Sequence, residues 1–382
     1  MLNYCAFATI SLNLRNFVMP SARYLSEHGY NVWVGCKYDE EFKQTLPPDI
    51  KYVGLDIERG FKLWKTIKTI FFLKRFFQKN DIHMIEYGTE NVSFCASIAG
   101  WMVGIPVRIY NHWGSRYVGY SGLLRRVSLF IERTTSRFST AIRDVSQRNM
   151  EICIEDKVYP AEKVKVLGYG GTVGVDFSRF SITEKKLFSS TLRERYEIGT
   201  DDFVFGDVGF IRRDKGSSEL FMAFKKLSAE NQRLWLMMVG DIYEEDPVDS
   251  HIMEWARQSD RVIFTGRVYD VERYMACFDC MVHPSYREGL GMVLQEAGAM
   301  GVPYITTDIP GPNEFGINGE TGLLVKKGDI NDLYEKMKYV IDNPDKRLLM
   351  SNAVYDLTKE RYERGVMVER IFKDRNQLWN NR

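Results

Sequence analysis

The sequence predicts an α/β protein of two domains, each built on a parallel β-sheet that helices cover on both faces. The chain has 382 residues, which is too long for one ordinary hydrophobic core and sufficient for two. Short apolar runs alternate with longer segments of helical period, as in βαβ units. A glycine-rich stretch at residues 166–176 interrupts this alternation, and we place the domain boundary there.

Both halves of the chain contain several of these runs. In the first half we expect strands at residues 4–9, 30–36, 84–87 and 107–110, and a helix at residues 19–28. In the second half we expect strands at residues 203–208, 234–239, 262–264 and 280–282, and a helix near residues 217–227. The predicted domains are residues 1–175 and 176–360. Residues 361–382 are predicted to form a helix that crosses back to the first domain.

The composition indicates a cytoplasmic globular enzyme. Hydrophobic residues make up 45% and charged residues 27%, which are globular values. No apolar run reaches the eighteen residues or so that span a membrane, and we expect no signal peptide. Cys277 and Cys280 have metal-like spacing, but no second pair or histidine cluster accompanies them. Buried thiols in a reducing compartment are therefore the expected state of the cysteines.

Charge is unevenly distributed along the chain. The formal net charge is +1, but residues 1–170 contain 23 Lys+Arg and 16 Asp+Glu, which leaves the first half at +7 and the rest at −6. This asymmetry suggests that the first half faces an anionic partner. Ordinary charge scatter between domains is the alternative.

Two glutamates in a strand–loop–helix segment are the most informative feature. Glu288 lies in a glycine-rich turn after an apolar run that ends at Val282, and Glu296 lies within a segment of helical period that starts at Met292. The loop and the helix N-terminus offer backbone N–H groups to an anion. Because carboxylates repel an anion, we expect the glutamates to bind hydroxyl groups. A ligand with phosphates and hydroxyls is a nucleotide sugar.

This segment resembles the signature of retaining glycosyltransferases of the GT-B fold, family 4. The Glu-x7-Glu spacing alone also occurs on solvated helices. The specific part is the full stretch from His283 to Gly322, with Pro-Ser before Glu288 and Glu-Ala-Gly-Ala-Met-Gly-Val-Pro from Glu296 onward. The resemblance covers nearly the whole chain and is best between residues 207 and 329. It implies two Rossmann-like domains whose parallel sheets face each other across a cleft.

The cations that hold the donor diphosphate are expected in residues 208–216. The sequence has neither a P-loop motif nor an Asp-x-Asp motif, so we expect no metal, and cationic side chains then take up the leaving charge. The resemblance implies that Lys215 is one of them. Phe210 stands where many relatives have an arginine. Arg212 lies on the same face of an extended strand and is our first candidate to replace it, with Arg213 as the second.

The resemblance also assigns the other contacts with the donor. Glu288 is expected beside the sugar, where its carboxylate orients hydroxyls and stabilises developing oxocarbenium charge. Glu296 is expected to accept hydrogen bonds from the ribose. Main-chain groups after the strand at residues 262–264 are expected to hold the base. The remaining predicted binding residues are Gly266, Arg267, Val268, Leu290, Gly291 and Met292.

His112 is the candidate histidine of the first domain. It follows the strand at residues 107–110, in a segment that resembles the one family members place beside the donor sugar and acceptor. Three roles stay open for it: general acid or base, hydrogen bonding to a sugar hydroxyl, and a structural role at the strand end. The loops at residues 9–16 and 86–91 are expected to line the acceptor side.

A basic aromatic segment at residues 61–79 has two interpretations. It interleaves Trp64 and several phenylalanines with lysines and Arg75. Such a helix can bind a membrane interface, or it can bury an apolar stripe in its domain and expose its lysines. Residues 123–137 add further arginines, with Glu132 as the only acid. Together the two segments are compatible with peripheral contact with anionic lipid.

From these features we expect a metal-independent retaining glycosyltransferase that needs no cofactor. It would move a sugar from a nucleotide diphosphate, with UDP as the expected nucleotide, to a glycan or polyprenyl-diphosphate-linked acceptor in bacterial capsule or exopolysaccharide synthesis. The expected location is the cytoplasm or the inner face of the plasma membrane, and no nucleic-acid partner is expected. Two alternatives stay open: a catalytically silent GT-B subunit, raised by Phe210, and a UDP-sugar 2-epimerase, which the motif between Glu288 and Glu296 disfavours.

Overall fold

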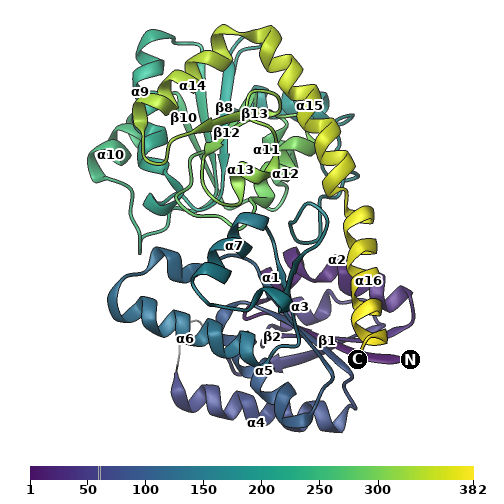
Figure 1. The fold of residues 1–382 in the computed structure, drawn as a ribbon. Helices are drawn as coiled ribbons and strands as arrows, with labels where there is room; N and C mark the ends of the chain where they lie inside the picture. The colour runs from purple at the N-terminus through teal and green to yellow at the C-terminus, as the bar shows by residue number, and fades with distance from the viewer. Residues whose placement is uncertain (59, 61) are drawn as a thin grey trace. The chain divides into compact units, whose positions relative to one another are not determined.

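The computed structural model describes residues 1–382 except Arg59 and Phe61, and of Arg116 it describes the backbone alone. The chain forms two compact units (Figure 1). Unit 1 comprises residues 1–174 and 364–382, and unit 2 comprises residues 175–363. The sequence analysis placed these boundaries after residues 175 and 360.

Unit 1 is built on a seven-stranded parallel sheet. The strand order is β3-β2-β1-β4-β5-β6-β7, so the order changes direction between β1 and β4. The strands are β1 (Leu2–Phe7), β2 (Tyr30–Lys37), β3 (Ile50–Leu55), β4 (Met84–Gly88), β5 (Val107–His112), β6 (Ala141–Asp144) and β7 (Val164–Val166).

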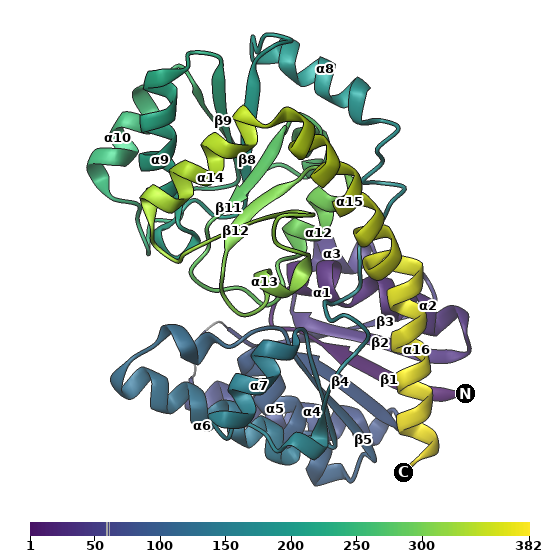
Figure 2. The same ribbon diagram turned by 45° about the horizontal axis from the view of Figure 1, so that its top comes forward.

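Helices cover both faces of this sheet because successive side chains of its strands point to opposite sides. From β1, Cys5 and Phe7 pack with α4, α5 and α6, whereas Tyr4 and Ala6 pack with α1, α2 and α16 (Figures 1 and 2). The helices are α1 (Ser11–Phe17), α2 (Met19–Glu27), α3 (Glu40–Gln44), α4 (Leu63–Lys79), α5 (Glu90–Val103), η1 (Arg116–Gly119), α6 (Gly122–Phe138), α7 (Gln147–Glu155), η2 (Ala161–Lys163) and α16 (Arg364–Asn380).

Unit 2 is built on a six-stranded parallel sheet. Its order is β10-β9-β8-β11-β12-β13, so the direction changes between β8 and β11. The strands are β8 (Phe203–Val208), β9 (Leu234–Val239), β10 (Val262–Gly266), β11 (Cys280–His283), β12 (Tyr304–Thr307) and β13 (Gly322–Val325).

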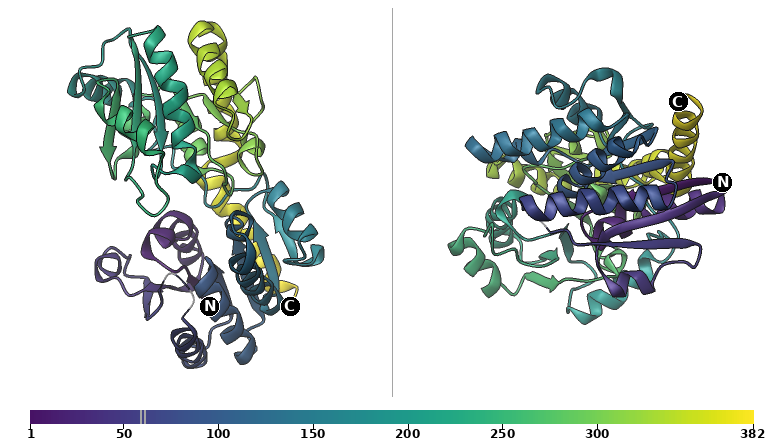
Figure 3. Two further views of the ribbon diagram at one scale, coloured as in Figure 1. Left: turned by 90° about the vertical axis from the view of Figure 1, so that its left-hand side faces the viewer. Right: turned by 90° about the horizontal axis from the view of Figure 1, so that it is seen from below.

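Helices also cover both faces of this second sheet (Figure 3). One core contains side chains of α9, α10 and α14, and the other contains side chains of α8, α11, α12 and α15. The helices are α8 (Lys185–Arg195), η3 (Arg213–Lys215), α9 (Ser217–Glu230), α10 (Ser250–Gln258), α11 (Val271–Met275), α12 (Met292–Ala299), α13 (Pro312–Phe315), α14 (Ile330–Asp342) and α15 (Pro344–Tyr362).

The predicted fold class is confirmed, since both sheets are parallel and alternate with helices. The strands expected at residues 203–208 and 234–239 are β8 and β9 with the same bounds. Five strands were not predicted: β3, β6, β7, β12 and β13. Four of them have only three or four residues, and runs this short carry little periodicity, whereas β3 has six residues.

The basic aromatic segment forms α4, which begins at Leu63; Phe61 lies outside the described residues. Thr69, Leu73 and Phe77 are the buried residues of this helix, and Trp64 is exposed. α4 therefore has one face in the unit 1 core and another in solvent. No helix in the described part of the chain is both long and apolar enough to cross a bilayer.

Hydrogen bonds between buried charged side chains connect α16 to the unit 1 sheet. Arg375 is 2% exposed and donates hydrogen bonds to Glu86 on β4, at 2.9 Å, and to Asp374, at 2.7 Å. Asp374 also accepts from Arg143 on β6, at 2.7–3.1 Å. The Tyr4 hydroxyl donates to Glu86 at 2.8 Å. Such a network is stable only when every buried charge keeps its partner.

We expect Arg375→Ala to lower the free energy of unfolding by about 3–5 kcal/mol, because Glu86 would be left as a buried charge without its cation. Denaturant unfolding followed by circular dichroism measures this change. The control is Lys373→Ala, which removes an exposed ion pair with Glu369 on the same helix and should leave the unfolding curve unchanged. A loss below about 1 kcal/mol for Arg375→Ala would show that water or other donors satisfy Glu86.

Candidate active site

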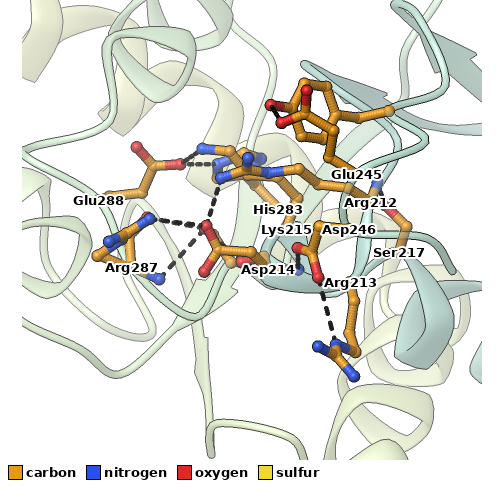
Figure 4. Close-up of polar contacts among 12 residues, drawn as sticks. Arg212, Arg213, Asp214, Lys215, Ser217, Glu245, Asp246, His283, Arg287 and Glu288 are labelled. Atoms are coloured by element: carbon orange, nitrogen blue, oxygen red, sulfur yellow. Dashed lines mark hydrogen bonds and ion pairs between the residues drawn. The ribbon is translucent and has the colours of Figure 1, made fainter. Parts of the chain in front are cut away.

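The predicted donor site lies at the carboxyl edge of the unit 2 sheet, where the strand order changes direction. β8 and β11 are neighbours, but β9 and β12, the strands that follow them in the chain, lie on opposite sides of the pair. The segments that follow β8 and β11 therefore diverge at the carboxyl edge of the sheet. In open α/β sheets, ligands usually bind at such a point. Lys215, from the segment after β8, and Glu288, from the segment after β11, point toward one another there (Figure 4).

Glu288 is the centre of this site. Its Oε1 accepts hydrogen bonds from Lys215 Nζ and from His283 Nε2, the latter at 2.8 Å. His283 Nδ1 lies 2.8 Å from Oδ1 of Asp207 on the neighbouring strand. Asp207 and His283 are both buried. The four side chains form a continuous row in which anions and cations alternate; we refer to it as the charge row.

The charge row fixes the ionisation of its members. Burial alone would lower the pKa of His283, but the carboxylates of Asp207 and Glu288 raise it to about 9. Burial alone would raise the pKa of Glu288, but the Lys215 ammonium and the His283 imidazolium hold it well below its ordinary value. At neutral pH, Glu288 is therefore a carboxylate and His283 is an imidazolium.

The sequence analysis identified Lys215 and Glu288 but did not identify His283 or Asp207. His283 is the first residue of the motif stretch, and Asp207 lies near the end of an apolar run. The local sequence therefore gives little indication that either residue belongs to the site. Their contact depends on the pairing of β8 with β11, which are more than 70 residues apart in the sequence. Nothing in the local sequence specifies that pairing.

Arg212 and Arg287 add two cations around Asp214. Both guanidinium groups contact Oδ2 of Asp214, Arg287 at 3.1 Å (Figure 4). Arg287 directly precedes Glu288 and Asp214 directly precedes Lys215, so this cluster lies beside the charge row. Three cations, Arg212, Lys215 and Arg287, therefore surround the two carboxylates of Asp214 and Glu288. The sequence analysis did not identify Arg287.

Phe210 is linked to Arg212 through the ring of Tyr243, which both side chains contact. The ring of Phe210 lies 5.3 Å from the ring of Tyr243, and the guanidinium carbon of Arg212 lies 5.3 Å from the centre of that same ring. A guanidinium at this distance from an aromatic ring is attracted by its π-electrons. Phe210 thus packs on the residue that holds Arg212, although it supplies no charge itself.

The two arginine candidates differ in position. β8 ends at Val208, but a parallel bridge between Ile211 and Ile242 continues the pairing of the two chain segments up to the residue before Arg212. Arg212 has an extended backbone and its side chain is 21% exposed. Arg213 begins η3, its side chain is 74% exposed, and its Nε lies 3.4 Å from Oδ1 of Asp246 (Figure 4). Arg212 therefore belongs to the cationic cluster, whereas Arg213 points away from it.

Gly216 allows the segments after β8 and β11 to approach each other. It has φ +72°, and a Cβ atom there would lie 2.1 Å from the carbonyl oxygen of Pro284. The Tyr286 N–H donates to the Asp214 carbonyl oxygen at 2.9 Å across the same contact. The close approach of these two backbones brings Lys215 within reach of Glu288.

Glycines also mark the carboxyl ends of the neighbouring strands, where the base is predicted to bind. Gly266 ends β10 and forms an isolated bridge with Gly240, and a Cβ at Gly240 would lie 2.0 Å from the Gly209 carbonyl oxygen. Arg267 pairs with Asp241 at 2.8 Å and is exposed. The neighbouring Val268 packs on the hydrophobic core. This edge offers main-chain atoms to a ligand.

The remaining predicted donor residues lie on α12 or just before it. Leu290 is buried, so it can offer a ligand only its main chain. Gly291 is the N-cap of α12 with φ +84°, and Met292 is the first residue of the helix. Glu296 lies in the second turn and is partly buried. Glu288 and Glu296 thus belong to the same β11–α12 segment of unit 2.

His112 belongs to unit 1 and ends β5. It is 1% exposed, and its Nδ1 lies 2.6 Å from Oδ2 of Asp144, which also accepts a hydrogen bond from the Tyr159 hydroxyl. Its Nε2 is buried and has no hydrogen-bond partner among the described residues. Burial would lower the pKa of His112, but Cys153 and Asp144 raise it to about 10. A raised pKa favours the protonated imidazole, which can donate a hydrogen bond but cannot serve as a base.

The loops expected to line the acceptor side follow the two strands at which the unit 1 sheet changes direction. The Thr9 N–H donates to Thr89 Oγ1 at 2.9 Å, and the two hydroxyl oxygens are 2.7 Å apart. Thr89 has φ +72°, which is uncommon for a residue with a branched Cβ. The segments after β1 and β4 are therefore joined at the position where open sheets bind ligands.

Within the described residues, one group of three potential metal ligands lies close together. His112, Asp144 and Cys153 are buried, with ligand atoms within 4.8 Å of one another. The side chains of Ser115 and Tyr117 contact the Cys153 sulfur, at 3.1 and 3.5 Å. Hydrogen bonds therefore engage Asp144, Cys153 and the Nδ1 atom of His112, whereas the Nε2 atom of His112 keeps no partner among the described residues. All six cysteines are buried and free, which agrees with the expected thiols.

A separate cavity of about 780 Å³ lies in unit 2 between α8 and the start of α15. Thr200, Asp279 and Pro303, which precede β8, β11 and β12, line it. It is therefore at the amino edge of the sheet, opposite Glu288, and its lining contains none of the predicted donor residues.

Residues 188–356 match the family model described as glycosyl transferases group 1. The chain therefore contains a group 1 glycosyltransferase domain. This match confirms the predicted enzyme class and includes the charge row and the segment between Glu288 and Glu296. The assignment to family 4 and the retention of configuration stay predictions.

Curated relatives of this glycosyltransferase extend over most of its length. The capsular polysaccharide biosynthesis glycosyltransferase CapM of Staphylococcus aureus is 28% identical over 345 residues, which cover 90% of this chain and 86% of CapM. The UDP-Gal:alpha-D-GlcNAc-diphosphoundecaprenol alpha-1,3-galactosyltransferase of Escherichia coli is 22% identical, covering 77% of this chain and 76% of that enzyme.

Solved structures share the fold of the glycosyltransferase. Sucrose-phosphate synthase from Thermosynechococcus elongatus has a TM-score of 0.81 at 16% identity and covers both chains completely. Anabaena HepE, in complex with UDP and glucose, has a TM-score of 0.78 at 18% identity and covers 98% of this chain and 100% of that one. These similarities confirm the predicted GT-B class.

We expect Gly216→Ala to impair both stability and activity strongly, because the new methyl group would push the loop of Lys215 away from Pro284. Gly319→Ala is a matched control: Gly319 has φ +85°, but nothing lies within 4 Å of a Cβ there. The control should lower the free energy of unfolding by only about 1 kcal/mol, the cost of a positive φ for a residue with a Cβ atom. Thermal unfolding and sugar transfer are measured for both variants. Equal losses of stability and activity in the two variants would show that the close approach of the Lys215 loop to Pro284 is not required.

We expect the imidazole of His283 to titrate near pH 9, against about 6.5 in the unfolded chain. Since the folded pKa is raised, the stabilisation is fully present below about pH 6.5 and is lost as the pH rises through 9. NMR of labelled histidines measures the titration, with His283→Gln to assign the signal. The difference in unfolding free energy between wild type and His283→Gln should shrink over the same interval. A midpoint at or below 6.5 would contradict the charge row.

Proposed function

We propose that this glycosyltransferase transfers a sugar from a UDP-sugar, with retention of configuration and without a metal, to a polyprenyl-diphosphate-linked glycan. The reaction would belong to the synthesis of a bacterial capsule or related surface polysaccharide, at the cytoplasmic face of the plasma membrane. The observation that carries this proposal is the charge row beside the cationic cluster, at the position where the unit 2 sheet changes direction.

The arrangement suits a substrate that carries both a diphosphate and hydroxyl groups. Lys215 and Arg212 pair with the carboxylates of Glu288 and Asp214, and a bound diphosphate would compete for both cations. Arg287 supplies a third cation to the same cluster, which favours such an anion. Glu288, once released from Lys215, keeps its hydrogen bond from His283 and can accept others from sugar hydroxyls.

The chemical step follows from these roles. The bond between the anomeric carbon and the diphosphate oxygen breaks, and Lys215 and Arg212 stabilise the charge that develops on the leaving diphosphate. The acceptor oxygen bonds to the anomeric carbon from the same face, and its proton passes to the leaving phosphate oxygen. The Glu288 carboxylate stabilises the positive charge of the oxocarbenium-like transition state. The proton transfer to phosphate makes a strong protein base unnecessary, which agrees with the protonated His112.

The names of the relatives support the proposed UDP-sugar donor and the proposed lipid-linked acceptor. HepE was solved with UDP and glucose and with UDP-glucose. The E. coli relative is named for transfer from UDP-Gal to a diphosphoundecaprenol-linked sugar, and CapM is named for capsular polysaccharide biosynthesis. We extend these activities to this chain as part of the proposal.

The first experiment is a panel of UDP- and GDP-sugars screened by thermal shift, with nucleotide release measured on the sugars that bind. One UDP-sugar should stabilise the protein, release UDP when a lipid-linked acceptor is added, and do so equally in EDTA. Glu288→Gln should reduce this release at least about 100-fold, while Glu320→Gln, an exposed glutamate of unit 2, should not change it. Binding without release would identify a catalytically silent subunit, and release that requires a metal would overturn the proposed chemistry.

We expect Arg212→Ala to weaken UDP binding about 10- to 100-fold, because a hydrogen bond between charged groups contributes about 1.5–3 kcal/mol. Arg213→Ala should change binding little, since its side chain is mostly exposed and pairs with Asp246. Isothermal titration calorimetry with UDP measures both dissociation constants. A larger effect for Arg213→Ala than for Arg212→Ala would reverse the assignment of the phosphate contact.

A further inference from the structure

The cavity at the amino edge of the unit 2 sheet contains none of the residues of the proposed reaction. Its volume of about 780 Å³ is typical of pockets that bind small molecules. Residues of α8 and α15, two helices that cover the same face of the sheet, line it together with the segment that precedes β11 (Figure 2). All of the lining residues belong to unit 2.

Part of the lining is apolar. Ala276, Cys277 and Phe278, which lie just before β11, are each at most 2% exposed. Ile198 and Pro303 are buried lining residues as well. An apolar or aromatic group is stabilised when it leaves water for such a surface. The cavity can therefore hold the apolar body of a ligand.

Basic side chains outnumber acidic ones in the lining by four to two. Arg193 pairs with Asp279 at 3.0 Å, and Asp279 also accepts a hydrogen bond from the Val204 N–H at 2.8 Å. The other three cations form no ion pair with any residue that the structure describes. These three are Lys185 and Lys186 of α8 and Arg347 of α15, and the second acid is Glu194.

Lys185 lacks the partners that a charged side chain of its burial usually has. Its ammonium can donate three hydrogen bonds, but its one partner among the described residues is the Gly301 carbonyl oxygen at 3.4 Å. Burial lowers the pKa of this ammonium. Lys185 is also the first residue of α8, where the helix dipole disfavours a cation, and the first turn of α8 contains no acid. An anion in the cavity would offset both effects.

Two contacts hold the Arg347 guanidinium in place without neutralising it. Its Nη1 donates to the Val340 carbonyl oxygen at 2.7 Å, and its central carbon lies 4.8 Å from the centre of the Phe203 ring. Neither partner carries a charge, so the guanidinium can still pair with an anion. Since Arg347 belongs to α15 and Lys185 to α8, cations line the cavity from two helices.

We infer that this cavity binds a small organic phosphate that has an apolar or aromatic body. The body would lie against residues 276–278, and the phosphate would pair with Lys185 and Arg347. A phosphate monoester carries a charge of about −1.5 to −2 at neutral pH, which suits three cations without carboxylate partners better than the single charge of a carboxylate. The ligand is neither the donor nor the acceptor, because the cavity lies at the edge of the sheet opposite Glu288.

Isothermal titration calorimetry with 1-naphthyl phosphate tests this inference on the full chain. The titrated protein carries Arg212→Ala and Lys215→Ala, so that the candidate donor site lacks two of its cations. One molecule of 1-naphthyl phosphate should bind per chain. Inorganic phosphate, which lacks the apolar body, and 1-naphthol, which lacks the phosphate, should each bind at least about tenfold more weakly.

Two further substitutions separate the cavity from the rest of the surface. Lys185→Met should weaken the binding of 1-naphthyl phosphate about tenfold or more, because a hydrogen bond between charged groups is lost. Lys346→Met is the matched control, since this exposed lysine of α15 does not line the cavity, and it should leave the affinity unchanged.

Thermal unfolding of each variant verifies that it folds and separates a ligand-binding lysine from a structural one. Lys185→Met should unfold at the same temperature as its parent or at a higher one, because it removes a partly buried charge that has no carboxylate partner. A lower unfolding temperature would assign Lys185 to the support of the fold and would count against the inference.

Three binding results would overturn the inference. They are no binding of 1-naphthyl phosphate, equal affinities in the Lys185→Met and Lys346→Met variants, and binding of inorganic phosphate as tight as that of 1-naphthyl phosphate. The last would indicate an anion site without an apolar part. Because these titrations use neither a UDP-sugar nor Glu288, their result is independent of the proposed transferase activity.

Discussion

The partial burial of the Glu288 carboxylate is the constraint on which the rest of the unit 2 site depends. An ion removed from water needs partners of opposite charge, and here His283 and Lys215 supply them from two different segments. The imidazole of His283 is charged only because Asp207 lies on its other side. Each member of the row therefore depends on the next, and the row depends on the pairing of β8 with β11.

This dependence also explains the shape of the surrounding backbone. Lys215 reaches Glu288 because Gly216 lets its loop touch Pro284, where any side chain would clash. The same loop carries Arg212, which an aromatic pair holds in place. In unit 1, the loops of Thr9 and Thr89 meet at the corresponding change of strand direction. In both units, a polar contact thus joins two segments at the point where the strand order of the sheet changes direction.

Apolar periodicity along the sequence predicted the fold class, and the resemblance to a known motif predicted Lys215 and Glu288 as site residues. The sequence analysis did not predict His283 or Arg287 as site residues, since their contacts depend on pairing between distant segments. The two interpretations of α4 could not be separated either. Helical spacing shows which residues share a face, but α4 has apolar residues on both faces, and only packing shows that Trp64 lies outside.

The division of the chain has a consequence for the order in which the protein folds during synthesis. Unit 2 is one continuous stretch, whereas unit 1 needs residues 364–382 to complete its core. Until Arg375 leaves the ribosome, Glu86 has no cation, and only α1 and α2 cover the sheet face that also packs with α16. Translation would therefore release a folded unit 2 while the earlier part of the chain still lacks its last helix, an interval in which a chaperone could protect the part of that face that α16 covers.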